Sequence, residues 1–418
     1  MKGMKQIAVA IALVATCGTA AAQQSIVGQP LPKWSAGELD IYHINTGRGD
    51  AQFMIFPDGT TMLEDASGPT EVGPPPFLLP AKPNASRPPA EWVARFIQQV
   101  MPKGIGKIDY AVLSHFHGDH MGVITKDSPE SKSGAYKLSG ITAIPEFIPI
   151  AKIVDRGWPT YDYPTPLENP TMVNYRKFLD WQIANKGLQV ERFKAGRNDE
   201  FVLLHDPKRF PTFEIRNLAV NGIVWTGTNS DSRNTIPPIG TLARKDIPLE
   251  NNLSIVFRVT YGKFDYYTGG DLSNKPGEVE FQPAPWKDIE SVVGKVCGPV
   301  DVMKANHHGS WDANSISLLS DLRPRVIVVD SRADGHPAQN TYERMASKRI
   351  WPGERDIFIT NLSPATFATT YRSKDAKSTQ GHVVIRVAPG GASYRVFVLD
   401  DSDEQLRVKA VFGPYASH

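Results

Sequence analysis

Hydrophobic and polar positions along the chain follow two periods, and each period predicts a different kind of element. Short runs of apolar and β-branched residues bounded by turn residues predict strands. These runs are found at residues 39–56, 108–114, 213–225, 254–259, 264–268, 300–304, 326–329, 357–360, 382–387 and 394–399. Strand-rich stretches with helices between them predict a layered α/β protein.

Apolar residues at helical spacing predict a smaller number of helices. In residues 90–101, Trp92, Phe96, Ile97 and Val100 fall on one face of such a helix. Three further helices are expected at residues 174–183, 312–319 and 341–348. Asp312 is the candidate N-cap of the helix at residues 312–319, because its carboxylate can accept from free backbone N–H groups.

The first 22 residues have the order of a secretory signal peptide. Lys2 and Lys5 precede an apolar run at residues 7–14, and small residues end at Ala22. We expect cleavage there, a linker over residues 23–36, and an exported, periplasmic or secreted protein. A lipid anchor on Cys17 is the alternative, since residues 14–17 loosely resemble a lipoprotein signal. Later apolar runs are strand-length, so no membrane span is expected.

Composition and charge narrow the class of protein. Of 418 residues, 41% are hydrophobic and 22% charged, which is enough for a packed core and argues against disorder. The formal net charge is +2, and Lys2 and Lys5 account for it. The rest of the chain is neutral, so we expect no stable nucleic-acid complex. The second cysteine, Cys297, is expected to be a buried, inert thiol.

The segment His115-Phe116-His117-Gly118-Asp119-His120 carries the strongest chemical signal. Three imidazoles and a carboxylate follow an apolar strand within six residues. Alternate residues of an extended segment share a side, so His115 and His117 can face one ion. A turn at Gly118 lets Asp119 and His120 reach a second position nearby. Such ligands suit Zn²⁺ and neighbouring first-row metals.

This segment resembles the HxHxDH motif of the metallo-β-lactamase superfamily, and other segments fit in the same order. Residues 61–65 resemble its early strand ending in Asp, residues 267–271 the strand ending in the bridging carboxylate, and residues 301–310 the strand before the last histidine ligand. Residues 45–51, the HHGS segment at 307–310 and the Gly-His-Pro turn at 335–337 resemble the nuclease-like domain of ComEC-type competence proteins. The resemblance covers about residues 37–362.

The resemblance implies an αββα sandwich with two divalent metal ions, zinc being expected and manganese the alternative. Residues 37–362 would form the hydrolase domain, and residues 363–418 a β-rich extension, either an accessory unit or extra strands of the main sheets. The implied metal ligands are His115, His117, Asp119, His120, Asp271 and His308. Asp65 and Asp50 would orient these ligands.

The same resemblance leaves several roles open. His308 is favoured over His307 as a ligand because Gly309 follows it, which would leave His307 facing the substrate. Asp119 could orient the attacking water, and His336 is a candidate substrate-side residue. Arg156, Trp158 and Tyr161 are candidate substrate contacts, with ordinary packing or ion pairing as the alternative. His43, in a strand-like segment, is expected to be structural.

One feature departs from the superfamily pattern. Many members have a further histidine ligand between the HxHxDH segment and the bridging carboxylate. Here the only histidine between residues 121 and 270 is His205. His205 and Asp155 are weak candidates for that place, so the first metal could have only three protein ligands.

These features predict an exported hydrolase that uses a metal-activated hydroxide. We expect phosphodiester or phosphoester bonds in a small molecule or nucleic acid as its substrate. The alternatives are hydrolysis of lactone, thioester or β-lactam bonds, or a non-catalytic surface-binding module that kept the fold. The sequence does not define the oligomeric state.

Overall fold

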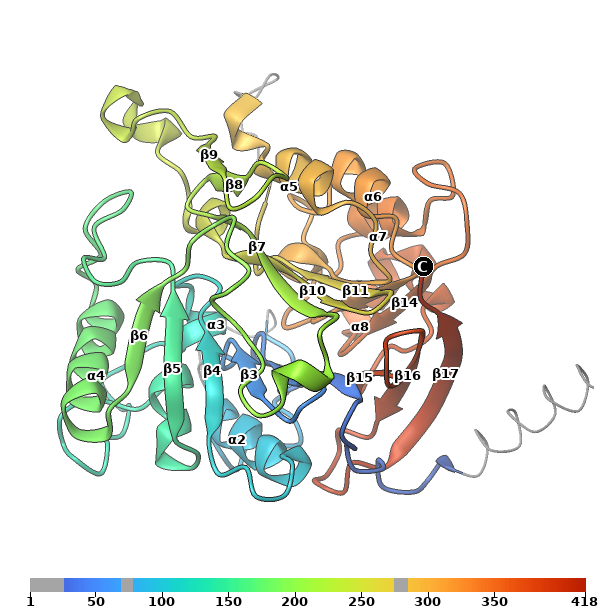
Figure 1. The fold of residues 1–418 in the computed structure, drawn as a ribbon, viewed down its shortest axis with the longest axis horizontal. Helices are drawn as coiled ribbons and strands as arrows, with labels where there is room; N and C mark the ends of the chain where they lie inside the picture. Colours follow the sequence, from blue (N-terminus) through green and yellow to red (C-terminus); the bar gives the residue numbers. More distant parts are fainter. Residues whose placement is uncertain (1–25, 69–77, 274–284) are drawn as a thin grey trace, which may run out of the picture.

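The computed structural model describes residues 26–68, 78–273 and 285–418, and it contains two large mixed sheets (Figure 1). The first sheet has the order β17 (Val408–Ala416), β16 (Ser393–Leu399), β15 (His382–Val387), β1 (Leu39–His43), β2 (Gln52–Ile55), β3 (Thr61–Glu64), β4 (Ile108–Val112), β5 (Ile150–Asp155) and β6 (Gln189–Arg192). The second has the order β14 (Asp356–Ile359), β13 (Val326–Val329), β12 (Val302–Lys304), β11 (Phe264–Thr268), β10 (Val256–Tyr261), β7 (Phe213–Val220), β8 (Ile223–Trp225) and β9 (Ser232–Asn234).

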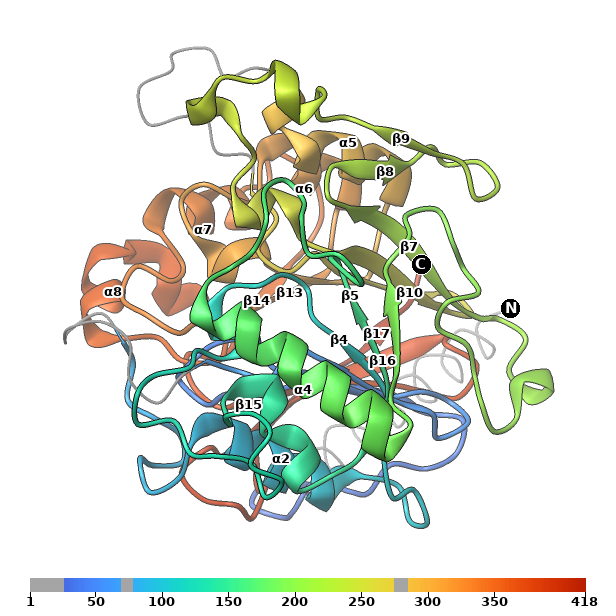
Figure 2. The same cartoon turned by 90° about the vertical axis from the view of Figure 1, so that its left-hand side faces the viewer.

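Helices cover the outer face of each sheet. The described helices are α2 (Pro89–Val100), α3 (Gly118–Met121), α4 (Pro170–Lys186), α5 (Ile289–Cys297), α6 (Ile316–Leu322), α7 (Gln339–Ala346) and α8 (Pro364–Thr369). Helices α5, α6 and α7 lie on one side of the molecule and α2 and α4 on the other (Figure 2). Within the described residues, none of the helices combines the length and apolar character that a bilayer crossing needs.

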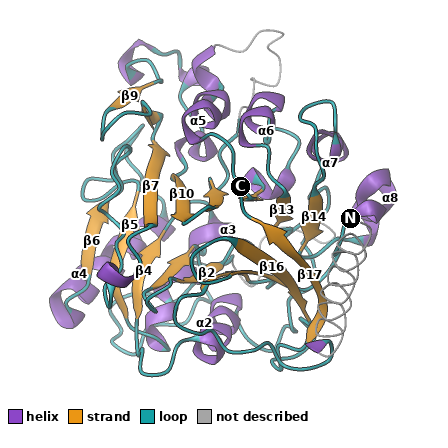
Figure 3. Cartoon of the chain, turned by 45° about the vertical axis from the view of Figure 1, so that its right-hand side comes forward, coloured by secondary structure: helices purple, strands orange, loops and turns teal. Residues whose placement is uncertain are grey.

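Three buried apolar clusters fill the spaces between these layers. One lies between the sheets and includes Ile41 and Met54 of the first sheet and Phe257 and Val302 of the second. A second cluster joins α2 and α4 to the first sheet, and a third joins α5, α6 and α7 to the second. The layers are therefore helix, sheet, sheet and helix, as the resemblance implied (Figure 3).

Local sequence accounts for where the helices begin and end. Helix α4 begins after Asn169, whose side chain accepts from the backbone N–H of Met172, and Gly187 ends it in a left-handed conformation. Helix α6 begins after Ser315, which accepts from Leu318 N. The predicted capping role of Asp312 is therefore wrong, and its carboxylate is available for a different contact.

Both ends of the described chain join the first sheet. Strand β15 pairs antiparallel with β1, and β16 and β17 extend the sheet beyond it. The C-terminal residues thus supply extra strands of a main sheet. Part of the predicted linker is ordered beside them, because Gly28 N donates to Val408 O at 2.8 Å and Leu31 N to Leu406 O at 2.9 Å. The predicted signal peptide and Cys17 lie outside the described residues.

Candidate metal centre

The candidate ligands lie where parallel strands of both sheets end. Asp65 follows β3 and the segment 115–120 follows β4, which are parallel neighbours. Asp271 follows β11 and His308 follows β12, which are also parallel neighbours. Because parallel strands end at the same edge of a sheet, all of these side chains meet at one edge of the sandwich.

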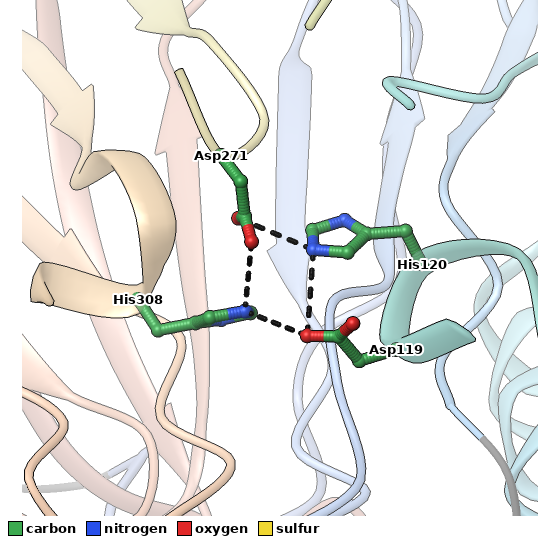
Figure 4. Close-up of side chains that lie close together, drawn as sticks. All are labelled: Asp119, His120, Asp271 and His308. Atoms are coloured by element: carbon green, nitrogen blue, oxygen red, sulfur yellow. Dashed lines mark hydrogen bonds and ion pairs between the residues drawn. The ribbon is translucent and has the colours of Figure 1, made fainter. Parts of the chain in front are cut away.

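Asp119, His120, Asp271 and His308 form one compact group of ligand atoms (Figure 4). Nε2 of His308 lies 3.0 Å from Oδ2 of Asp119 and 3.4 Å from Oδ2 of Asp271. Nε2 of His120 lies 3.2 Å from Oδ1 of Asp271 and 3.7 Å from Oδ2 of Asp119. Atoms about 2.1 Å from one tetrahedral ion lie about 3.4 Å apart. The four side chains are therefore spaced as ligands of a single ion.

A second group contains His115, His117 and again Asp271. His115 is buried, His117 is exposed, and Nε2 of His115 lies 3.8 Å from Oδ2 of Asp271. Asp271 belongs to both groups, which is the position that a bridging carboxylate would occupy. The structure thus brings together all six residues named as metal ligands from the sequence.

The weaker candidates for a further ligand lie elsewhere. His205 is 40% exposed, and its Nε2 lies 4.0 Å from Oδ2 of Asp109, away from the ligand groups. Asp155 is buried and accepts hydrogen bonds from the hydroxyl groups of Tyr161 and Tyr175 at 2.7 and 3.0 Å. Neither residue supplies a third histidine or carboxylate beside His115 and His117.

Several buried ligand atoms in this region lack a hydrogen-bond partner. They include Nε2 of His115, Nε2 of His120 and Oδ1 of Asp271. Leaving such atoms buried and unpaired costs about 1–3 kcal/mol each. They converge with two carboxylates that repel one another, so a divalent cation would satisfy both the lone pairs and the charge. The residues therefore fit the metals that the motif implies.

Electrostatics keep three of these candidate ligands, Asp271, Asp119 and His115, unprotonated. Burial alone would raise the pKa of Asp271, but His120 and His308 hold it well below its ordinary value. Burial would likewise raise the pKa of Asp119, which Arg332 and His120 hold well below the usual range. Burial, together with His120, lowers the pKa of His115, so its imidazole is neutral and offers a lone pair. Burial would lower the pKa of His120 and of His308, but Asp271 raises both well above the ordinary value, so a metal ion would have to displace a proton from these two imidazoles.

The carboxylates of Asp65 and Asp50 contact the candidate ligand histidines. Oδ2 of Asp65 accepts from Nδ1 of His120 at 2.7 Å, which leaves Nε2 to face Asp271. Oδ1 of Asp50 lies 3.0 Å from Nδ1 of His308. The other oxygen of Asp50 lies 2.6 Å from the ammonium group of Lys304, a fully buried cation that the sequence analysis did not single out.

His307 and His308 have different environments. His308 is buried, and its Nδ1 donates to the backbone carbonyl of Asp330 at 2.8 Å. His307 is 19% exposed, and its Nδ1 donates to Asp312 at 2.8 Å. Its Nε2 lies 3.8 Å from Oδ2 of Asp271, outside both ligand groups. This geometry favours His308 as the ligand and leaves His307 at the open side of the cluster.

A buried glutamate that sequence reasoning missed shapes the HHGS segment. Glu290 on α5 accepts from Asn306 Nδ2, Asn314 N and Ser315 N, each at 2.8 Å. These bonds fix the segment in which both His307 and His308 have positive φ angles. Such strained backbone persists only where surrounding contacts over-determine it.

The loop after β13 carries further contacts to the centre. The ring of His336 stacks on that of His308, with centroids 5.0 Å apart. Arg332 makes an ion pair with Asp119. His43 is buried, and its Nδ1 lies 2.9 Å from the carboxylate of Asp330, whose backbone carbonyl accepts from His308.

Arg156 and Tyr161 differ from their predicted substrate-facing positions. The Arg156 side chain has 0% exposure and pairs with Glu250, which also accepts from the backbone N–H of Phe116 at 2.8 Å. Tyr161 is buried and donates to Asp155. Trp158 is half-buried and packs against the helix-covered core of the first sheet. Arg156 and Tyr161 thus hold the loops around the HxHxDH segment in place.

Comparison with solved structures gives two similar proteins. A protein from Parabacteroides distasonis ATCC 8503, assigned as a metal-dependent hydrolase, aligns over 79% of this chain and 97% of its own, with 11% identity and a TM-score of 0.33. The metallo-β-lactamase fold protein YhfI from Bacillus subtilis aligns over 76% of this chain and 96% of its own, with 10% identity and a TM-score of 0.32. No protein-family model and no curated protein matches the sequence.

These similarities are too distant to assign any residue of the site, which is defined by its own side chains. The order of the layers and the position of the centre follow from the sheets, the apolar clusters and the ligand distances. Two facing mixed sheets between helices, with the HxHxDH segment, Asp271 and His308 at one edge, give this chain a metallo-β-lactamase-like αββα fold.

Proposed function

We propose that this protein is a metal-dependent hydrolase. The single observation that carries the proposal is that Asp271 belongs to two groups of ligand atoms, each within 4.8 Å of one another. Two divalent ions held there would lower the pKa of water toward about 7 and polarise the bond to be cleaved. A binding module would have no need for two such groups sharing one carboxylate.

The residues of the chain have separable tasks in this proposal. His115 and His117 would hold one ion, and Asp119, His120 and His308 the other, with Asp271 shared. Asp65 fixes the proton of His120 on Nδ1, so Nε2 is free to bind. His307 and His336 stand at the exposed side of the cluster, where they would contact a substrate.

We infer that the substrate carries a phosphoester or phosphodiester bond. The ComEC-type resemblance of residues 45–51, 307–310 and 335–337 supports this inference. Zinc is the proposed metal because imidazole and carboxylate ligands at tetrahedral spacing suit it, with manganese as the alternative. The N-terminal sequence supports an exported protein that acts outside the cytoplasm.

A substrate panel on zinc-loaded protein tests this proposal. The panel contains bis-(p-nitrophenyl) phosphate, p-nitrophenyl phosphate, single-stranded DNA, a chromogenic cephalosporin and a lactone. We expect turnover of the phosphodiester that disappears after chelation and returns with metal. Turnover of only the lactone or cephalosporin would contradict the proposed substrate class. No turnover of any of these substrates would contradict the proposal that the protein is a hydrolase.

A further inference from the structure

Arg332 lies on a firmly anchored loop that follows β13. Its backbone carbonyl accepts from Leu79 N at 3.1 Å. Further along the loop, Ser331 Oγ donates to the carbonyl of His336 at 2.8 Å, and Gly335 N donates to Thr366 Oγ1 at 2.8 Å. The loop is thus fixed at several points, and the position of Arg332 beside the centre is set by the fold.

The guanidinium group of Arg332 is only partly used. Its Nε makes an ion pair with Oδ2 of Asp119, the same oxygen that lies 3.0 Å from Nε2 of His308. No described residue accepts a hydrogen bond from its Nη1 or Nη2 group, and the side chain is 28% exposed. A guanidinium fork is therefore available to solvent directly beside a candidate metal ligand.

Other cations near the centre are differently placed. The ammonium group of Lys304 has 0% exposure and is bound by Asp50 and by the carbonyl of Gly270 at 3.0 Å. Arg156 also has 0% exposure and is held by Glu250. Lys304 and Arg156 can therefore balance charge or support loops, but they cannot reach a ligand from solvent as Arg332 can.

We propose that Arg332 binds an anionic oxygen of the substrate next to the metal centre. A planar guanidinium with free Nη groups matches the paired oxygens of a phosphate or carboxylate. Because Arg332 also contacts Asp119, a substrate oxygen bound by Arg332 would lie beside the candidate metal ligands. Nε2 of His308, on whose ring His336 stacks, lies 3.0 Å from the same oxygen of Asp119. This assignment rests on the proposed hydrolase function and refines it, since it selects anionic over neutral substrates.

Two variants and one matched control test this assignment. Arg332→Met removes the charge and the fork, whereas Arg332→Lys keeps the charge alone. The control is Arg176→Met, because Arg176 on α4 is 27% exposed and pairs with Glu168 at 3.1 Å, outside the candidate site. Metal content is measured for each protein, so that loss of metal is separated from loss of substrate binding.

The first measurement is calorimetric binding of inorganic phosphate to the zinc-loaded proteins. We expect Arg332→Met to weaken phosphate binding at least about tenfold, a change of about 1.4 kcal/mol. It should keep its metal stoichiometry, and Arg332→Lys should recover part of the affinity. Unchanged phosphate binding in Arg332→Met would overturn the assignment. Loss of metal in that variant would also overturn it, because Arg332 would then only support Asp119.

The second measurement compares kcat/KM for bis-(p-nitrophenyl) phosphate, a chromogenic cephalosporin with its carboxylate, and neutral p-nitrophenyl acetate. Arg332→Met should reduce kcat/KM for the anionic substrate that is hydrolysed at least tenfold more than for the neutral ester. A larger effect on the phosphodiester would show that Arg332 binds a phosphate oxygen, and a larger effect on the cephalosporin that it binds a carboxylate. An equal reduction for anionic and neutral substrates would contradict the assignment.

The binding measurement does not require turnover, so the two proposals fail separately. If no phosphodiester is cleaved but Arg332→Met loses phosphate affinity, the oxyanion assignment stands and the substrate proposal falls. If phosphodiester is cleaved and phosphate affinity is unchanged in Arg332→Met, the hydrolase stands and the assignment falls.

Discussion

Oδ2 of Asp65 accepts a hydrogen bond from Nδ1 of His120 at 2.7 Å, although 55 residues separate them. The Ser114 hydroxyl donates to the same oxygen at 2.6 Å, and Ser114 N donates to Oδ1 at 2.8 Å. The two hydrogen bonds from Ser114 therefore hold the Asp65 carboxylate in the orientation in which it binds the imidazole of His120. It joins the end of β3 to the ligand segment after β4 and decides which nitrogen of His120 faces Asp271.

Asp65→Asn should weaken metal binding about 10- to 100-fold, because the amide keeps the shape but loses the charge that orients His120. Competition with a chelator measures the dissociation constant. Asp109→Asn is the control, since Asp109 is also buried and accepts from Thr61 N and Thr61 Oγ1, each at 3.0 Å. Equal metal affinity in Asp65→Asn and the natural protein would refute this role.

His308→Ala and His307→Ala should differ in metal content. His308 has its Nδ1 bound to Asp330, so its Nε2 is directed at Asp119 and Asp271. We expect His308→Ala to lose about one metal ion per chain. The His307→Ala protein should keep both metal ions, because His307 pairs with Asp312 and lies outside both groups of candidate ligands. Metal analysis of the purified variants measures this difference. Loss of metal in His307→Ala but not in His308→Ala would make His307 the ligand instead of His308.

Arg156→Met should destabilise the fold. Removal of the guanidinium leaves Glu250 largely buried without its charged partner, which costs about 3 kcal/mol of unfolding free energy. Urea denaturation measures that loss. The Arg156→Met protein should keep the KM of the natural protein at a temperature where it is folded. A large rise in KM with unchanged stability would restore the substrate-contact role that the sequence suggested.

Glu64 should make stability fall as the pH rises. Burial, and then repulsion by Asp65, raises the pKa of Glu64 from 4.5 to about 8. The folded state therefore keeps a proton that the unfolded state releases above about pH 5, so stability is lost between about pH 5 and pH 8. Glu64→Gln cannot titrate and can still accept from Thr268 Oγ1, which donates to Glu64 at 2.9 Å.

Thermal unfolding midpoints across this pH range test that prediction. The Glu64→Gln protein should lose less stability than the natural protein as the pH rises. A smaller slope should remain, because burial also raises the pKa of Glu290 to about 7. Parallel curves for the two proteins would contradict a protonated Glu64 at neutral pH.

The candidate ligand set could be predicted from the sequence because metal chemistry demands rare residue types at fixed local spacing. The segment 115–120 carries four ligands within six residues, and Asp271 and His308 end recognisable strands. Strand ends are where parallel sheets gather functional side chains, so the edge of the sandwich was predictable as well. The fold class followed from the same resemblance.

The supporting residues were not accessible because their partners are distant in sequence. Glu250 and Glu290 belong to no local motif, and each accepts from backbone N–H groups of another segment. Lys304 did carry a signal, since a lysine inside an apolar strand needs a buried counter-charge. For Arg156, the ion-pairing alternative holds rather than the substrate contact, because its guanidinium turns inward to Glu250 although its neighbours in sequence are aromatic.

The proposed two-metal centre depends most on Asp271 as a ligand shared by two ions. Asp271→Ala removes that carboxylate and would leave two cations close together with less neutralisation. His205→Ala is the control, because His205 is 40% exposed and lies outside both ligand groups. His43 is unsuitable as a control, since it contacts Asp330 beside His308.

The decisive measurement is the number of metal ions per chain in Asp271→Ala, with phosphodiester turnover on the same samples. We expect loss of at least one ion and a fall in turnover of about 100-fold or more, equivalent to about 2.7 kcal/mol of transition-state stabilisation. His205→Ala should match the natural protein in both. Full metal content with full turnover in Asp271→Ala would contradict the shared-ligand centre.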